Sequence, residues 1–235
     1  MTISWKRISA IFLKDYKDFS RNMAVSIVIF LPIIIAAIYG RIGTENLQAH
    51  FLYINMTFSF VATYVQCCLI AEEKEKNTLR GLMLSPASTF DILGGKSLLS
   101  FVLTIFVIAL SMFFGEYLPQ NLAAVGTGIV ISTIFYIAIG TLLGLVAKSV
   151  MEASVLVLPV AGIFMMGSFV TVFADKYPVL KLVDYMPNSQ LIYLAESVEE
   201  GAGFVDVLSN LGIIGIWVVL SVILTTVFYK KRMVD

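Results

Sequence analysis

A short stretch of dense charge lies between two apolar segments, each long enough to cross a lipid bilayer. Six of the nine residues from Glu72 to Arg80 are charged. Each charge placed in hydrocarbon costs at least ~2.5 kcal/mol on insertion scales, so this stretch must leave the membrane between two membrane-crossing helices. The excursion continues to Lys96, about 25 residues in all, which is far longer than a tight turn needs. We expect this loop to contact something outside the membrane.

Composition supports a membrane protein. Of the 235 residues, 59% are hydrophobic and 14% are charged, whereas soluble domains contain about 25% charged residues. Sixteen basic and sixteen acidic residues give a formal net charge of zero. Because nucleic-acid binding requires an excess of basic residues, nucleic acid is excluded as a partner, and the lipid bilayer is the expected surrounding.

Hydropathy predicts six membrane-spanning helices, at ~20 residues per crossing. The fold class is therefore an all-α membrane protein, and we expect residues 1–235 to form a single transmembrane domain. The six spans are Met23–Gly40, Phe51–Ala71, Ser97–Gly115, Ala123–Ala147, Ala153–Ala174 and Ser209–Tyr229.

The basic residues predict the orientation of these spans. An even number of spans puts both termini on one side, and that side collects thirteen of the sixteen lysines and arginines. The three on the other side are Arg41, Lys176 and Lys181. Because basic residues concentrate on the cytoplasmic side of membrane proteins, we expect both termini and the loop of residues 72–96 to be cytoplasmic.

Residues 1–22 have the pattern of an amphipathic helix. Apolar and aromatic residues recur there at helical spacing, among them Trp5, Phe12 and Phe19, with lysines around them. We expect this helix to lie along the cytoplasmic membrane surface. The alternative is a helix packed against other parts of the protein.

The connection between the fifth and sixth spans, residues 175–208, is too apolar for a solvated loop. We expect short external helices that pack against the outer ends of the spans. Pro187 interrupts the segment, and Asn188 or Ser189 is well placed to cap a second short helix. In the fourth span, Gly140 and Gly144 form a small-xxx-small pattern, which predicts close contact with another helix.

The order of these features resembles the type-2 ABC transporter permease family. A basic amphipathic helix, two spans, a charged loop and four further spans follow one another in that family. The residues that carry the resemblance are Thr78-Leu79, the apolar stretch Leu82-Met83-Leu84, Ser85-Pro86, Lys96 at the third span, and Met186-Pro187 followed by Leu191-Ile192.

Two residues of the loop depart from the family pattern. Asn77 stands where glycine is usual, and Arg80 stands where an acidic residue is common. Because asparagine tolerates left-handed backbone geometry, we expect the turn at Asn77 to persist. The resemblance implies an ATPase partner that contacts this loop, and Arg80 could alter which ATPase binds there.

The resemblance implies the transmembrane subunit of a bacterial ABC exporter in the cell membrane. Such a subunit pairs with a second permease copy or a paralogue and binds two cytoplasmic ABC ATPase subunits. Residues 72–86 would be the coupling element. Its polar contacts to the ATPase would come from Glu72, Glu73, Lys74, Glu75 and Thr78, its apolar anchors would be Leu79 and Leu82, and Pro86 would end it. An ordinary solvated loop is the alternative.

The sequence contains no set of catalytic residues, so we expect a transport subunit and not an enzyme. Gly95-Lys96-Ser97 looks like the end of a phosphate-binding loop, but Phe90 occupies the position of the first glycine. The chain has one histidine, His50, and two adjacent cysteines, Cys67 and Cys68, which do not suggest a metal site. ATP and Mg²⁺ would therefore be bound by the partner ATPase, and this chain would bind no cofactor.

The polar second span and part of the fifth are expected to line a cavity in the dimer. The residues concerned are Asn55, Ser59, Thr63, Tyr64, Met166 and Phe169. Hydrogen bonding between helices of one subunit is the alternative explanation for the polar ones. A lining rich in aromatic and methionine residues suits a hydrophobic or amphipathic cargo, such as a drug, an antibiotic or a peptide, as in multidrug or peptide resistance.

Two other functions are compatible with a small multi-pass protein. An ATP-independent secondary transporter would usually carry an acidic residue deep in a span, and this chain has none there. A membrane scaffold or immunity protein would bind a toxic peptide without transporting it.

Overall fold

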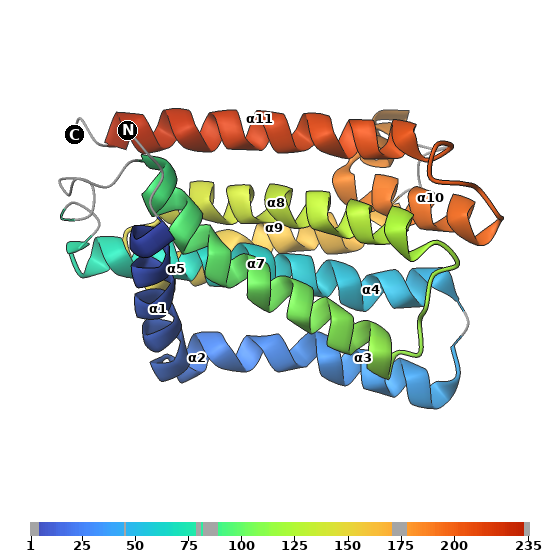
Figure 1. Ribbon diagram of the computed structural model, residues 1–235, viewed down its shortest axis with the longest axis horizontal. Coiled ribbons are helices and arrows are strands. Elements are labelled where there is room, and N and C mark those ends of the chain that lie inside the picture. Colours follow the sequence, from blue (N-terminus) through green and yellow to red (C-terminus); the bar gives the residue numbers. More distant parts are fainter. Residues whose placement is uncertain (1–4, 45, 79–80, 82–88, 171–177, 233–235) are drawn as a thin grey trace.

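The structure, a computed structural model, describes residues 5–44, 46–78, 81, 89–170 and 178–232. Its long helices run along one bundle, and the short helix α1 (Trp5–Arg21) crosses them at one end (Figure 1). The first described helix, α1, and the end of the last one, α11 (Leu208–Arg232), lie at that same end, which we call the terminal end. The opposite end, which we call the distal end, carries the short helix α10 (Pro187–Glu199).

Among the described residues, five helices are long and apolar enough to cross a membrane. The first is Met23–Ile42, which consists of α2 (Met23–Ser26), η1 (Ile27–Ile29) and α3 (Phe30–Ile42). The second is Leu47–Glu75, which consists of α4 (Leu47–Thr57), η2 (Phe58–Val65) and α5 (Gln66–Glu75). The other three are Asp91–Phe114 within α7 (Thr89–Phe114), Leu122–Val146 (α8) and Leu208–Lys230 within α11 (Leu208–Arg232). The span expected at Ala153–Ala174 coincides with α9 (Val150–Val170), whose described apolar part is the shorter Val150–Met165. The sixth crossing therefore stays a prediction.

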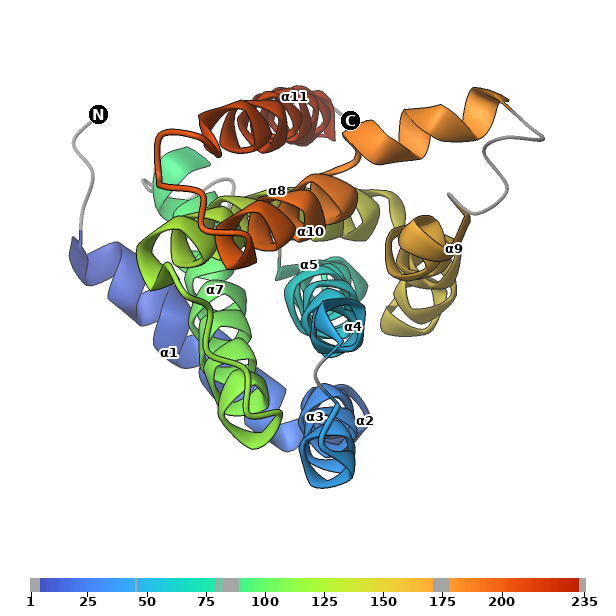
Figure 2. The same ribbon diagram turned by 90° about the vertical axis from the view of Figure 1, so that its right-hand side faces the viewer.

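The helix formed by α4, η2 and α5 is the most buried of the five and occupies the centre of the bundle (Figure 2). Segment η2 is a π-helix, with wider turns than the α-helices on either side. Buried polar groups generally need partners, and two polar residues of this helix hydrogen-bond to α8. Thr63 donates a 3.2 Å hydrogen bond to the carbonyl of Tyr136, and Gln66 donates a 2.9 Å bond to Thr141.

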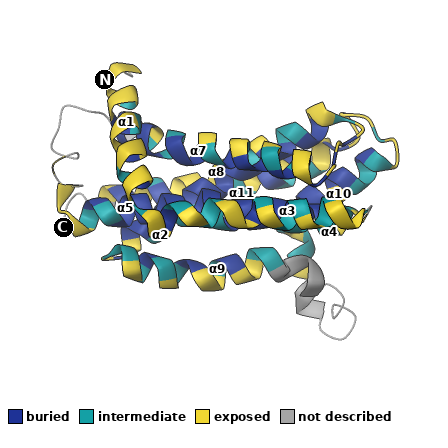
Figure 3. Cartoon of the chain, turned by 90° about the horizontal axis from the view of Figure 1, so that it is seen from below, coloured by how far each residue is buried: buried dark blue, intermediate teal, exposed yellow. Residues whose placement is uncertain are grey.

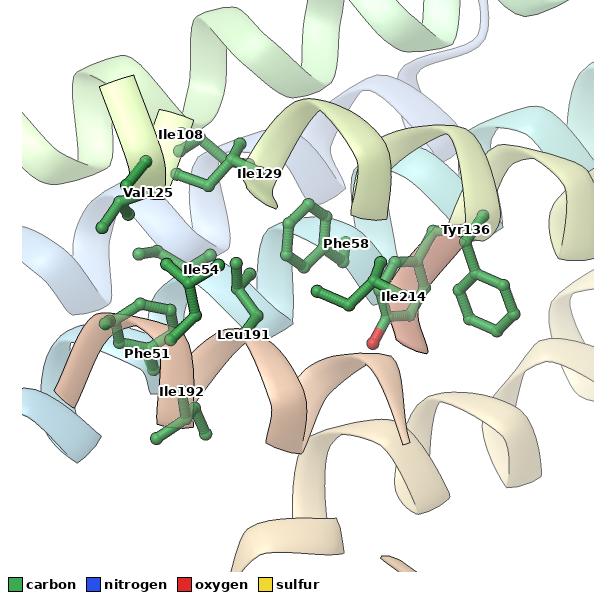
Figure 4. Close-up of a cluster of buried hydrophobic side chains, with 14 of the residues drawn as sticks. Phe51, Ile54, Phe58, Ile108, Val125, Ile129, Tyr136, Leu191, Ile192 and Ile214 are labelled. Carbon is green, nitrogen blue, oxygen red and sulfur yellow. The ribbon is translucent and has the colours of Figure 1, made fainter. Parts of the chain in front are cut away.

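Apolar side chains from seven elements, namely α3, α4, η2, α7, α8, α10 and α11, meet at the distal half of this central helix (Figure 4). Phe58 of η2 stacks on Tyr136 of α8, with ring centroids 4.8 Å apart. Helix α10 inserts Leu191 and Ile192 into the same cluster, and both side chains are buried. The short distal helix is therefore part of the core and not a surface appendage.

Gly140 and Gly144 of α8 lie against the central helix, as the small-xxx-small pattern predicts. A β-carbon built on Gly140 would lie 2.4 Å from the carbonyl oxygen of Thr63. One built on Gly144 would lie 2.7 Å from the carbonyl oxygen of Cys67. The absence of side chains at both positions lets the two backbones approach closely.

The distal segment contains a 3₁₀-helix, η4 (Pro178–Tyr185), followed by α10. The expected cap of α10 is wrong: Met186 occupies the N-cap position and Pro187 is the first helical residue, because proline lacks the N–H that an N-terminal position leaves unbonded anyway. Asn188 is buried instead, and its side chain donates a 3.0 Å hydrogen bond to the carbonyl of Phe164 in α9.

Helix α1 packs one face on α7 and leaves much of its length exposed (Figure 3). Ile11 meets α7 so closely that a β-carbon on Gly95 would lie 2.9 Å from the Ile11 Cβ. Trp5 and Tyr16, by contrast, are exposed. The buried face of α1 supports the alternative that this helix packs against other parts of the protein. Its crosswise orientation would also suit a helix on a membrane surface, and that location stays a prediction.

Gly140→Ala should destabilise the protein by about 1–3 kcal/mol, because the new methyl group overpacks against the backbone of Thr63. Gly126→Ala is the matched control, since it lies on the same helix and nothing lies within 4 Å of its built β-carbon. Alanine in a helix interior is favoured over glycine, so this control should hold or raise the melting temperature. Thermal melts of both purified variants in detergent test the contact; equal melting temperatures would contradict it.

Candidate functional site

The charged segment of the sequence forms the end of α5 at the terminal end of the bundle. Helix α5 stops at Glu75, and Asn77 follows with a φ of 56°. Asparagine thus takes the left-handed turn in place of glycine, as predicted. Three successive side chains before that turn, those of Glu73, Lys74 and Glu75, reach three different parts of the bundle.

Glu73 lies in a group of four charges that we call the charge cluster: Lys14 and Asp15 of α1, Glu73 of α5 and Lys96 of α7. Nζ of Lys96 lies 3.0 Å from Oε1 of Glu73 and 3.2 Å from Oδ1 of Asp15. Nζ of Lys14 bonds to the same oxygen of Glu73. One lysine of α7 thereby bridges acids on two other helices.

Three of the four side chains of the charge cluster are buried, whereas the side chain of Lys14 is 43% exposed. Lys96 is 0% exposed, Asp15 is 1% exposed and Glu73 is 2% exposed. Burial raises the pKa of Asp15, and the charges of Lys96 and Lys14 oppose that rise. Two lysines balance two acids, so the formal charges cancel. Buried ions are tolerated only when they are paired and hydrogen-bonded, as they are here.

Further polar contacts surround the cluster. Thr78, just beyond the end of α5, donates its hydroxyl hydrogen to a carboxylate oxygen of Glu73. Arg7 of α1 lies 3.5 Å from the carboxylate of Asp91 in the first turn of α7, and Asp91 is buried. Helices α1 and α7 are therefore joined by ionic contacts at two levels.

Lys74 and Glu75 bind to the ends of two other helices. Nζ of Lys74 donates a 2.6 Å hydrogen bond to the carbonyl of Leu145 and another to the carbonyl of Ala147, at the C-terminus of α8. The carboxylate of Glu75 accepts a 2.9 Å bond from the backbone N–H of Val150, the first residue of α9. A cation at a helix C-terminus and an anion at an N-terminus both complement the helix dipole.

The end of α5 is thus bonded to α1, α7, α8 and α9. The residues expected to contact an ATPase divide into three groups. In the first group, Glu73, Lys74 and Glu75 bond to other helices, and Glu72 forms an ion pair with Lys76, four residues further along the chain, at 2.5 Å. Thr78 is exposed as a residue although its hydroxyl bonds to Glu73. Leu79, Leu82 and Pro86 lie outside the described residues.

The expected cavity residues of the second span occupy the central helix. Asn55, Ser59 and Thr63 are buried inside the bundle, and the hydrogen bond of Thr63 supports the alternative of bonding between helices. The hydroxyl of half-buried Tyr64 lies 3.2 Å from that of Ser154 in α9. The side chains of Met166 and Phe169 lie outside the described residues. A cavity in a dimer stays a prediction.

Asp15 is the residue of the charge cluster that sequence reasoning missed. It lies between Ile11 and Phe19 at a spacing of four residues, on the face of α1 that is buried. An acid at that position of an otherwise apolar stripe is unusual, since charged residues are rarely buried without a partner. The position of Asp15 on this apolar face is therefore the feature of the sequence that could have predicted an ionic partner inside the protein.

The described residues contain no group of three or more histidine, cysteine, aspartate or glutamate side chains that could hold a metal ion. The charge cluster contains two lysine ammonium groups, which carry positive charge and cannot coordinate a metal ion. Its chemistry is therefore structural: it holds helices together through buried ion pairs.

Comparison with known families supplies one match. The sequence profile of the family described as "ABC-2 family transporter protein" matches residues 10–227. The match begins in α1, ends in α11 and includes the whole charge cluster. No curated protein matches the chain.

Lys96→Met should destabilise the protein by about 3–5 kcal/mol, because it leaves Asp15 and Glu73 buried with Lys14 as their shared cation. The double variant Lys96→Met with Glu73→Gln should recover part of that loss, since it removes the unpaired charge together with the lysine. The measurement is thermal melting in detergent.

Lys76→Met is the control for this comparison, because its ion pair with Glu72 is exposed and such pairs contribute only about 0.3–0.5 kcal/mol. If Lys96→Met melted like Lys76→Met, the charge cluster would not stabilise the bundle.

Proposed function

The chain belongs to the ABC-2 transporter family, as a multi-pass membrane component, and we propose that it is the permease subunit of a bacterial ABC exporter. Members of this family generally pair with an ABC ATPase and bind no cofactor themselves. The proposed complex contains two permease subunits, this chain with a second copy or a paralogue, and two cytoplasmic ATPase subunits that bind ATP and Mg²⁺.

One observation carries the proposal: the loop of residues 79–88 is flanked on both sides by the charge cluster. Glu73 and Thr78 precede the loop, and Lys96 follows it on α7. Lys74 and Glu75 bond the same helix end to α8 and α9. The residues on either side of the loop are therefore bonded to each other and to α1, α8 and α9.

The distribution of basic residues supports a cytoplasmic position for this loop. Helix α1, the end of α5, the start of α7 and the end of α11 lie together at the terminal end (Figure 1), and they carry most of the lysines and arginines. By the positive-inside rule, the terminal end faces the cytoplasm. Both termini and the loop then lie on the side where ATP is available.

The mechanism that we propose makes residues 72–86 the coupling element. Leu79, Leu82 and Pro86 contact the ATPase, while Glu73, Lys74 and Glu75 bind the coupling element to the bundle. ATP-driven closure of the ATPase pair moves the loop, and the buried ion pairs make α1 and α7 follow it. Such a bistable element, biased by nucleotide, is a common form of switching.

The cargo that we propose is hydrophobic or amphipathic: a drug, an antibiotic or a peptide. Its pathway would run between the two permease subunits, past the central helix and α9, which serves as the remaining crossing of six. The composition of these helices supports this class, because residues 51–71 of the central helix and residues 153–170 of α9 are mostly aromatic, aliphatic and methionine, and the polar residues among them are uncharged.

The first test is purification of the tagged chain in mild detergent from its native cells, followed by mass spectrometry. We expect a soluble ABC ATPase at about one copy per permease, because each permease presents one coupling loop. Absence of an ATPase, under conditions that preserve a known ABC complex, would refute the exporter and favour a scaffold or a secondary transporter.

Leu82→Asp should abolish copurification of the ATPase, because a charge replaces an apolar anchor of the loop. Val205→Asp is the matched control, since Val205 is exposed at the distal end and its change should leave the complex intact. Both variants must melt like the wild type for the comparison to count. An ATPase retained by Leu82→Asp would contradict the coupling assignment.

Glu73→Gln should separate binding from coupling. Because Glu73 is buried and faces Lys96, its loss should leave ATPase copurification intact. Transport-dependent stimulation of ATP hydrolysis, measured in proteoliposomes, should fall. Unchanged stimulation would mean that the ion pairs do not transmit the movement.

A further inference from the structure

Helix α1 carries five basic residues, and the structure divides them into two groups. Arg7 and Lys14 pair with acids of the bundle, Asp91 and Glu73 respectively. The other three are exposed and have no acidic partner among the residues that the structure describes: Lys6, Lys17 and Arg21. The bundle therefore uses two of these cations, and three remain open to a partner outside the chain.

The three unpaired cations share one side of α1. An α-helix turns by about 100° per residue, so Lys6 and Lys17, eleven residues apart, lie about 20° from one another around the axis. Arg21 lies about 40° beyond Lys17 by the same geometry. We call this row of Lys6, Lys17 and Arg21 the basic stripe.

A second row, of large apolar side chains, runs beside the basic stripe. It consists of Trp5, Leu13 and Tyr16, all exposed, and we call it the apolar stripe. Leu13 lies about 20° from Lys6 around the helix axis, so the two stripes adjoin. Trp5 is 74% exposed. Contiguous apolar side chains on a surface indicate contact with a partner or with a membrane.

The contacts of α1 determine which way the apolar stripe faces. Trp5 lies about 180° from Lys14, nine residues away. Lys14 bonds to Glu73 in the end of α5, which extends beyond α1 at the terminal end (Figure 1). Phe12, about 20° from Trp5 around the axis, packs against the apolar cluster that contains Val65 of the central helix. The apolar stripe therefore faces along the spans and towards the bilayer that they cross.

This arrangement complements the surface of an anionic bilayer. Tryptophan and tyrosine favour the boundary between headgroups and acyl chains, and apolar side chains beside them enter that boundary. Cations beside such a row lie at the level of the lipid phosphates and attract anionic headgroups. The unpaired cations and the exposed rings thus fit one partner, a phospholipid with a negatively charged headgroup.

We propose that α1 binds anionic phospholipids of the bilayer, with the basic stripe at their headgroups and the apolar stripe among their acyl chains. The buried side of the same helix bonds through Asp15 to Lys96. Bound lipid and the charge cluster are therefore held by one helix. The inference rests on α1 alone and holds whether or not the chain is an exporter subunit.

Fluorescence of Trp5 in the reconstituted full-length protein tests the proposal. The chain contains two tryptophans, so Trp217→Phe leaves Trp5 as the sole reporter. Vesicles of equal parts phosphatidylcholine and phosphatidylglycerol carry bromine on the acyl chains of one lipid or of the other. Bromine quenches only rings close to it, so quenching reports which lipid contacts α1. We expect brominated phosphatidylglycerol to quench Trp5 about twofold more strongly or better, because cations at a bilayer surface enrich anionic lipid.

The triple variant Lys6→Gln, Lys17→Gln and Arg21→Gln should bring quenching by the two lipids to the same level. Both should still quench Trp5, since the apolar stripe is unchanged. The matched control is Lys148→Gln with Lys230→Gln, because both lysines are exposed at the terminal end but lie outside α1. The control should keep the preference for phosphatidylglycerol.

Equal quenching by the two lipids in the Trp217→Phe protein would overturn the proposal, and that measurement does not depend on how the other variants fold. Absence of quenching would overturn it too, and would leave this side of α1 to a protein partner. A preference that survived in the triple variant would refute the role of the basic stripe. Inorganic phosphate that removed the preference, where chloride of the same ionic strength did not, would assign the cations to free phosphate. None of these results touches the exporter assignment, which copurification of an ATPase tests separately.

Discussion

One fully buried lysine determines how the terminal end of this protein is built. Lys96 lies where α7 enters the bundle, and it has no water to solvate its charge. The cost of burying an ammonium group is several kcal/mol, so its partners must come to it. Asp15 and Glu73 supply that compensation from α1 and α5. The crosswise position of α1 and the direction in which α5 leaves the bundle are therefore consequences of the same ion pairs.

The central helix connects the two ends of the molecule. Its residues extend from His50, which stacks on Tyr117 at the distal end, to Glu73, in the charge cluster. Between them the helix is surrounded by apolar side chains, and the side chain of Gln66 hydrogen-bonds to both α7 and α8. A change in the position of this helix at one end must be accommodated by the packing at the other, because close-packed interiors deform little.

The sequence predicted features that depend on local chemistry. The helical spans follow from apolar length, the contacts of Gly140 and Gly144 from their spacing, and the left-handed turn at Asn77 from the tolerance of asparagine for that geometry. Partners distant in the chain were not predictable. Nothing local pairs Asp15 with Lys96, which lies 81 residues away, and the buried bond of Asn188 to α9 replaced the cap that its residue type favours. Pro187 is the first residue of α10, so Asn188 lies inside the helix and not at its N-cap position.

The π-helical segment Phe58–Val65 has a consequence for how the central helix is interpreted. In an α-helix each residue advances by about 100°, so a wheel drawn from one end assigns every side chain to a face. A π turn holds an additional residue, which offsets all later positions by roughly that angle. Asn55 and Gln66 therefore cannot be assigned to faces on a single wheel. An insertion or deletion of one residue in this segment would rotate the half that ends in the charge cluster against the distal half while leaving both halves helical.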